Sequence, residues 1–214
     1  MAVFSLLAYD GIEPIDIGAT FGVLSMAKRV APDLGFFVVA PEAGPVEMSN
    51  NLVLQAPYGV GDVSATDVTM VLGGPGWETA AQDARILDHL RGIADQQILA
   101  SVCTGGMILA AAGLLEGRKA TTKDQILEGE TRPLDLLGQH AGVDAVSARI
   151  VDEGAIVTGG GVSLGIDMTL YLLGRLCGEA VRAETARILE YGAAYEANAA
   201  RLPDRIVAWP TSAA

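Results

Sequence analysis

Apolar and polar positions follow two patterns along this chain: short apolar runs, and longer stretches with apolar residues at helical spacing. The short runs predict strands at residues 3–9, 35–40, 68–72 and 98–102, and strands joined by a turn around Asp152-Glu153-Gly154 within residues 149–158. The helical spacing predicts helices at residues 15–29, 83–96, 104–115, 163–176 and 179–191. Strands that are apolar almost throughout and alternate with helices are typical of a parallel sheet covered on both faces. We therefore predict an α/β fold with a mostly parallel sheet.

Weaker signals mark the ends of these elements. Asn50-Asn51 lies at the centre of residues 46–55 and predicts a hairpin turn. Asp83 is expected to cap the helix that follows it, and Gly117 to end the helix of residues 104–115.

The remaining segments are shorter and less regular. Short strands are expected at 119–122 and 143–147, and a mixture of helix and loop at 127–140. We treat residues 1–214 as one domain, with its core at about 3–192 and a C-terminal tail at 193–214.

Composition narrows the function classes. Half of the 214 residues are hydrophobic and the mean hydropathy is +0.37, so the chain can bury a large core. A formal net charge of -12 argues against nucleic acid and anionic membranes as partners, because both need a basic surface. The N-terminus lacks a basic leader, and two cysteines do not make a disulfide framework. We therefore expect a cytoplasmic protein.

One stretch has the length of a marginal membrane span. Residues 98–115 carry no charge. Thr104-Gly105-Gly106 interrupts the stretch, however, and a strand followed by a buried helix gives the same run. We expect the strand and helix, and no membrane partner.

Glycine-rich or acidic breaks follow several predicted strands. They lie at Asp10-Gly11, 73–76, 103–106 and 159–161. In parallel sheets, sites form at the carboxyl ends of the strands, so some of these breaks should meet.

Cys103 is the first candidate for chemistry. On a turn between a strand and a helix it would resemble a nucleophile elbow, and the helix N-terminus would lower the pKa of its thiol. We expect a strained backbone there and ready oxidation to sulfinic acid. The alternative is a small, buried, structural cysteine.

A carboxylate is the expected proton-transfer partner. His89 lies in an amphipathic helix and His140 in a loop, so neither suggests a cysteine–histidine pair. Asp10, Glu13 and Asp16 follow the first strand, and Asp16 stands between isoleucines. Beside a thiolate its pKa should rise, because two negative charges resist coexistence. The alternative is that Asp16 caps a helix.

The other candidates are weaker. Residues 73–76 (GGPG) can present backbone N–H groups for an oxyanion, or can simply end a strand. Residues 159–161 (GGG) fail the dinucleotide fingerprint, because Leu164 stands where its last glycine belongs. Cys177 is expected to be structural, and we expect neither a metal nor a cofactor.

Three motifs together resemble the DJ-1/PfpI superfamily, and within it the isonitrile hydratases. They are ASVCTGG at 100–106, AAAGLLEGRKATT at 110–122 and TGGGVSLGIDM at 158–168. The resemblance spans about residues 3–192. It implies a flavodoxin-like three-layer sandwich, related to class I glutamine amidotransferases, that usually forms a homodimer. It also implies a small-molecule substrate, with isonitriles converted to N-substituted formamides through a thioimidate.

The resemblance also assigns site residues. It implies that Cys103 is the nucleophile and Asp16 the carboxylate from the first strand–helix junction. Gly74 and Thr104 would supply backbone N–H groups, and Gly73 and Thr104 would contact substrate.

One position departs from the pattern. After ATT many members carry histidine, and isonitrile hydratases carry aromatic residues, whereas this chain has Lys123. The departure leaves two alternatives open. One is a thiol-based stress-response or glyoxal-detoxifying protein, and the other is a binding protein without catalysis.

Overall fold

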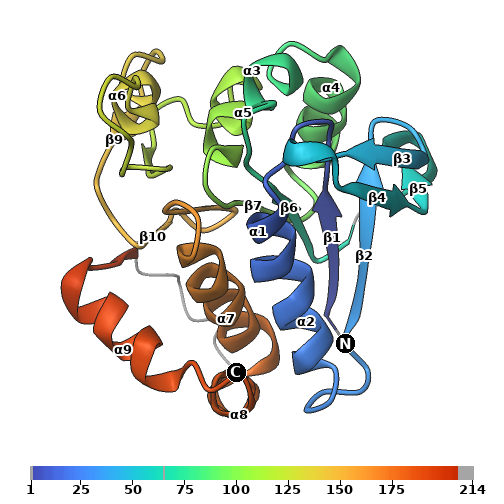
Figure 1. The fold of residues 1–214 in the computed structure, drawn as a ribbon, viewed down its shortest axis with the longest axis vertical. Helices are drawn as coiled ribbons and strands as arrows, with labels where there is room; N and C mark the ends of the chain where they lie inside the picture. Colours follow the sequence, from blue (N-terminus) through green and yellow to red (C-terminus); the bar gives the residue numbers. More distant parts are fainter. Residues whose placement is uncertain (1, 65, 207–214) are drawn as a thin grey trace.

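An eight-stranded sheet runs through the computed structural model, which describes residues 2–64 and 66–206 (Figure 1). In spatial order its strands are β12 (Arg205–Ile206), β10 (Ile150–Asp152), β11 (Ile156–Gly159), β7 (Ile98–Ser101), β6 (Val68–Val71), β1 (Val3–Leu7), β2 (Gly35–Ala40) and β5 (Tyr58–Gly59). Every neighbouring pair is parallel except β10 with β11.

The central strands have the order β2-β1-β6-β7-β11, which is the flavodoxin-like arrangement. The flavodoxin-like α/β fold predicted from the sequence is therefore confirmed. The order reverses between β1 and β6, and at such a switch point the loops beyond the strands diverge and leave a crevice. The segments that follow β1, β6 and β7 meet at this crevice.

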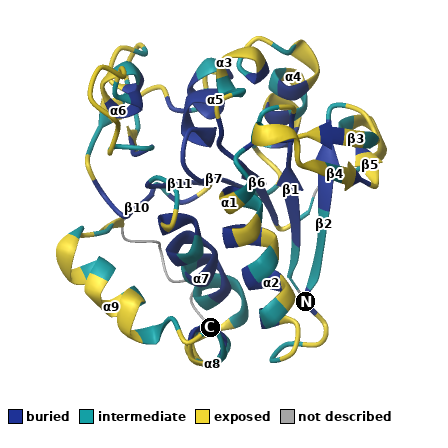
Figure 2. Cartoon of the chain, viewed as in Figure 1, coloured by how far each residue is buried: buried dark blue, intermediate teal, exposed yellow. Residues whose placement is uncertain are grey.

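Helices cover both faces of the sheet. One layer holds α1 (Pro14–Ile17), the π-helical turn η1 (Gly18–Gly22), α2 (Val23–Ala27), α7 (Leu164–Cys177) and α8 (Glu179–Ile188). The other holds α3 (Trp77–Ala80), α4 (Ala84–Ile93), α5 (Gly105–Ala111) and α6 (Pro133–Leu137). The central strands β1, β6, β7 and β11 are almost entirely buried between these layers (Figure 2).

Short elements complete the fold. They are the antiparallel pair β3 (Gly44–Glu47) and β4 (Val53–Ala56), the parallel pair β8 (Lys119–Ala120) and β9 (Asp144–Ala145), the 3-10 turns η2 (Ser49–Asn51) and η3 (Val60–Asp62), and α9 (Gly192–Arg201). The predicted hairpin is confirmed, since β3 and β4 are joined through Asn50 and Asn51, whose φ angles are 60° and 63°.

The helix ends follow local chemistry. The side chain of Asp83 accepts a hydrogen bond from the Arg85 amide at 2.9 Å, which confirms it as the cap of α4. The prediction that Gly117 ends the next helix is wrong, because α5 stops at Ala111. Gly113 has φ 77°, and the Leu114 amide beyond it donates to the Leu109 carbonyl, a pattern typical of a Schellman end.

Two regions differ from the sequence-based expectation. The segment after β6 contains the short helix α3, which the glycine and proline signal concealed. The described part of the expected tail contains α9 and β12, and β12 joins the main sheet beside β10, whereas residues 207–214 lie outside the described residues. The uncharged run of residues 98–115 is β7 followed by α5, and none of the helices described is long and apolar enough to cross a bilayer.

Candidate active site

Cys103 lies at the carboxyl end of β7, on the turn that leads into α5. Its φ angle is 51°, in the left-handed region that a non-glycine residue adopts only under constraint. Its amide donates to the Gly160 carbonyl at 3.1 Å, and its own carbonyl accepts the Thr122 hydroxyl at 2.7 Å. The expected strained turn between a strand and a helix is therefore present.

Gly73 allows the segments after β1, β6 and β7 to meet. A Cβ atom on Gly73 would lie 2.5 Å from the Thr104 amide nitrogen, 2.7 Å from Cys103 Cβ and 2.8 Å from Asp16 Oδ2. No side chain fits in that space. Gly73 thus lies against both Cys103 and Asp16. It does not line the adjoining cavity, where a residue that contacts substrate would be expected.

Asp16 is fully buried in α1, behind Gly73. Its Oδ2 accepts the Gly73 amide at 2.9 Å, whereas Oδ1 has no hydrogen-bond partner. The pKa of Asp16 is raised to about 7, mainly by burial and also by Glu13, although the Gly73 amide and the Cys103 side chain act to lower it. The expected rise is present, but its main cause is burial and not a neighbouring thiolate. No cap hydrogen bond from Asp16 is present either.

The structure contradicts the expected low pKa of the Cys103 thiol. The pKa of the thiol is raised to about 12, mainly by burial and also by the Asp16 carboxylate. The Val162 and Thr104 amides and the Lys123 ammonium lower it, without outweighing burial. Burial thus disfavours the charged forms of both Cys103 and Asp16.

The two expected backbone donors differ in position. The Thr104 amide hydrogen-bonds the Cys103 side chain, as an oxyanion or thiolate donor must. The Gly74 amide instead donates to the Thr104 hydroxyl oxygen at 2.9 Å, so it is occupied in this structure. Val162, which the sequence analysis missed, supplies the second amide at the sulfur and has φ 56°. Its only sequence signal was the run of glycines before it.

A cavity of about 380 Å³ opens beside the sulfur, a volume in the range of small-molecule sites. Its lining comprises Glu13, Ile15, Gly74, Pro75, Trp77, Cys103, Thr104, Lys123, Glu130 and Val162. It is neither a purely apolar pocket nor an open polar cleft. Sequence reasoning did not place Trp77 or Glu130 here, since neither lies in a recognised motif.

Two charged side chains in the lining of this cavity, Glu13 and Lys123, were already named in the sequence analysis. The Glu13 carboxylate accepts the Ser49 hydroxyl at 2.9 Å, and the Lys123 ammonium donates to the Gln125 carbonyl. Glu13 follows β1, whereas Lys123 packs against Gly161 beyond β11, so the two charges lie on opposite sides of Cys103 in the order of the sheet.

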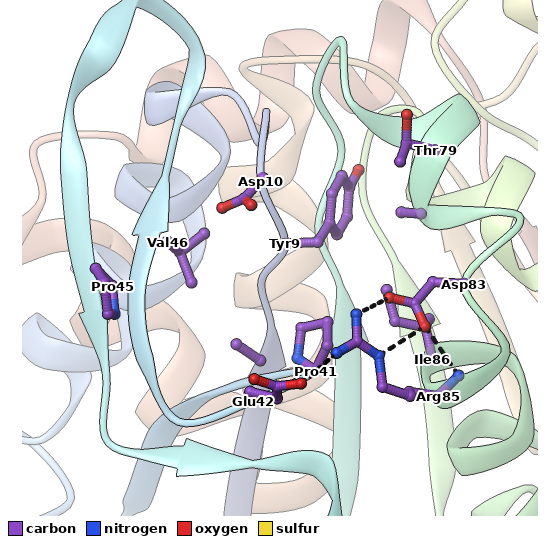
Figure 3. Close-up of a pocket in the computed structure, with 12 residues that line it drawn as sticks. Tyr9, Asp10, Pro41, Glu42, Pro45, Val46, Thr79, Asp83, Arg85 and Ile86 are labelled. Atoms are coloured by element: carbon purple, nitrogen blue, oxygen red, sulfur yellow. Dashed lines mark hydrogen bonds and ion pairs between the residues drawn. The ribbon is translucent and has the colours of Figure 1, made fainter.

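A second cavity, of about 310 Å³, lies beyond the carboxyl ends of β1 and β2 (Figure 3). Arg85 in it is bound by Asp83 and by Glu42, each at 2.6 Å. The hydroxyl of Tyr9, whose ring lines this cavity, donates to the Leu72 carbonyl at 2.9 Å. Cys103 does not line it, so the candidate nucleophile faces the first cavity alone of the two.

Neither histidine lies at the Cys103 cavity, and no cluster of metal-binding side chains is present among the described residues. Neither His89 nor His140 lines the Cys103 cavity. Across residues 2–64 and 66–206, His, Cys, Asp and Glu form no group of three or more that could hold a metal ion. Cys177 lies in α7, half-buried and free of any disulfide.

Comparison with known proteins agrees with this geometry. The family model "DJ-1/PfpI family" matches residues 1–175. The chain belongs to the DJ-1/PfpI family. It is 33% identical to isonitrile hydratase from Pseudomonas putida over 185 residues, which cover 86% of this chain and 74% of that protein.

Solved structures of the DJ-1/PfpI family have the same fold. A ThiJ/PfpI family protein from Pseudomonas syringae superposes with a TM-score of 0.75 at 27% identity, covering 89% of this chain and 75% of the other. Drosophila melanogaster DJ-1beta superposes with a TM-score of 0.75 at 19% identity, covering 89% and 98%. At that identity the second likeness concerns the fold alone.

The buried Asp16 carboxyl predicts an unusual dependence of stability on pH. Because its pKa is about 7 when folded and 3.8 ordinarily, the folded state binds more protons between these values. The free energy of unfolding should therefore decrease as pH rises from about 4 to about 7, by up to about 4 kcal/mol. Asp16→Asn should lack this loss. Urea unfolding of both proteins at several pH values measures it, and parallel curves for the two would contradict it.

Proposed function

We propose that this protein is a cysteine-dependent hydratase that converts isonitriles to N-substituted formamides. The observation that carries the proposal is the contact of Cys103 and Asp16 across Gly73, beside a cavity of small-molecule size. The likeness to isonitrile hydratase over most of the chain supports the choice of substrate.

The first step joins the sulfur to the substrate. The Asp16 carboxylate takes the proton of the Cys103 thiol, and the sulfur forms a bond with the terminal carbon of the isonitrile. That carbon then takes the proton from Asp16, which leaves a thioimidate, R–N=CH–S–Cys103. The Thr104 and Val162 amides stabilise negative charge on the sulfur before the bond forms.

The second step releases the product. Water adds across the C=N bond, with its oxygen on carbon and a proton on nitrogen, and the carbon–sulfur bond then breaks. The formamide leaves and Cys103 regains a proton. Asp16 is the base for the water, since a group with a pKa near the working pH exchanges protons most effectively.

The setting of the enzyme completes the proposal. We place the protein in the cytoplasm, where reducing conditions keep the Cys103 thiol free. We also propose a homodimer, because the helical run of residues 14–27 exposes the apolar side chains of Ile15 and Phe21.

Substitution of the two reactive residues tests the mechanism. Cys103→Ala should abolish turnover of an isonitrile, because no nucleophile remains. Asp16→Asn should slow turnover by about 10²–10⁴-fold, the usual contribution of a general acid–base group. In the unsubstituted protein kcat/KM should rise with pH through about 7, as Asp16 loses its proton, and Asp16→Asn should lack this rise.

Steady-state assays on a panel of isonitriles, methylglyoxal and peptide amides provide the measurement. Cys177→Ala is the matched control and should leave turnover unchanged. Wild-type rates for Asp16→Asn would show that Asp16 is structural. Turnover of methylglyoxal but of no isonitrile would favour the glyoxal-detoxifying alternative, to which the Lys123 departure points.

Sedimentation at micromolar concentration tests the dimer. We expect twice the chain mass of 22.1 kDa, because the exposed apolar residues would then be covered. A single species of 22.1 kDa would contradict it.

A further inference from the structure

Arg149, which precedes β10, is enclosed by the last part of the described chain. Its guanidinium donates to both carboxylate oxygens of Asp204, at 2.8 and 2.6 Å. It also donates to Asp167 Oδ1 at 3.1 Å and to the Tyr195 carbonyl at 3.2 Å. The Arg149 side chain is 4% exposed and that of Asp167 is fully buried, so these charges depend on one another for stability.

Asp167 extends the network into α9. Its Oδ2 accepts the Tyr191 hydroxyl at 2.8 Å and the Asn198 amide at 3.1 Å. The Tyr195 ring stacks on the Arg149 guanidinium at 4.4 Å. The segment of residues 191–204 is thus bound to Arg149 and to the first turn of α7, where Asp167 lies.

The same arginine holds both ends of the loop beside Cys103. At its start, the Gly160 amide donates to the Arg149 carbonyl at 3.0 Å, and the Gly160 carbonyl accepts the Cys103 amide. At its end, the loop runs into the turn of α7 that Asp167 ties to the Arg149 side chain. Val162 between them has a left-handed backbone, which persists only where the surroundings fix it.

We propose that residues 191–204 are a positioning strap: Asp204, through Arg149, holds residues 160–163 closed over Cys103. Asp204 and Arg149 act through this loop and touch no reacting atom. The inference rests on Cys103 as the nucleophile of the proposed function, but not on any substrate. Leu202 of the strap lines a hollow together with Gly160 and Val162, so the strap and the loop border the same space.

The expected sign follows from the balance of effects at the sulfur. Burial is the largest effect on the Cys103 thiol and disfavours its ionised form, whereas the Val162 amide favours that form less strongly. If the loop loosens, the thiol loses the burial that disfavours its ionised form and also loses the Val162 amide that favours it. Because burial is the larger effect, water reaches the sulfur and the thiol ionises more easily. Asp16 and Lys123, the charged side chains that act on Cys103, are left in place.

Asp204→Asn tests the strap with iodoacetamide as the probe. At pH 8, mass spectrometry should show Cys103 alkylated about tenfold faster than in the unsubstituted protein, equivalent to about one unit of thiol pKa. Cys177 in the same molecule should be unchanged. Hydrogen exchange should speed up in residues 160–164 and at the Cys103 amide, but not in β1 or β6.

Two further variants keep the result interpretable. Asp204→Glu keeps the charge and should restore most of the wild-type rate. Glu184→Gln removes an exposed pair with Arg187 on α8 and should change neither cysteine. An unchanged or slower Cys103 in Asp204→Asn would overturn the proposal, as would an equal increase at Cys103 and Cys177, which indicates general loosening.

Discussion

The absence of a side chain at Gly73 is the constraint on which the site depends. Gly73 lies in the loop after β6, and a Cβ atom on it would stand within 3 Å of the loop after β7 and of the Asp16 side chain, which follows β1. This close approach puts Asp16 and Cys103 in contact while both remain buried. Any residue larger than glycine would push the Asp16 carboxyl away from the Cys103 thiol. The proposed reaction needs these two groups in contact.

Burial then decides which of the two groups carries the proton. Both ionised forms are disfavoured away from water, so the pair resists holding a negative charge. With a pKa of about 7 for Asp16 and about 12 for Cys103, the carboxyl is the more acidic group of the pair. A substrate that accepts the sulfur relieves this competition, because the sulfur then carries no charge. In the proposed reaction the site therefore disfavours ionisation of the thiol alone and favours bond formation with an electrophile that fits the cavity.

Sequence reasoning recovered the parts of the molecule whose causes are local. Alternating apolar runs predicted the sheet, Asp83 the start of α4, and the glycine breaks the edge where the site lies. It could not weigh burial against the helix N-terminus at Cys103, since burial depends on how distant segments pack. For the same reason it missed Val162, whose amide reaches the sulfur only after β11 pairs with β7. The ordered α9 and β12 were likewise hidden, because the pairing of Asp204 with Arg149 spans 55 residues.

The central claim is that Cys103 bonds covalently to the isonitrile carbon. The most direct measurement is mass spectrometry of the protein quenched with acid during turnover, with Asp16→Asn included to slow release of the intermediate. The account predicts that the Cys103 peptide gains the full mass of the isonitrile, because the thioimidate retains every substrate atom, and that Cys177 gains nothing. Formamide production with Cys103 never modified, or undiminished in Cys103→Ala, would contradict it.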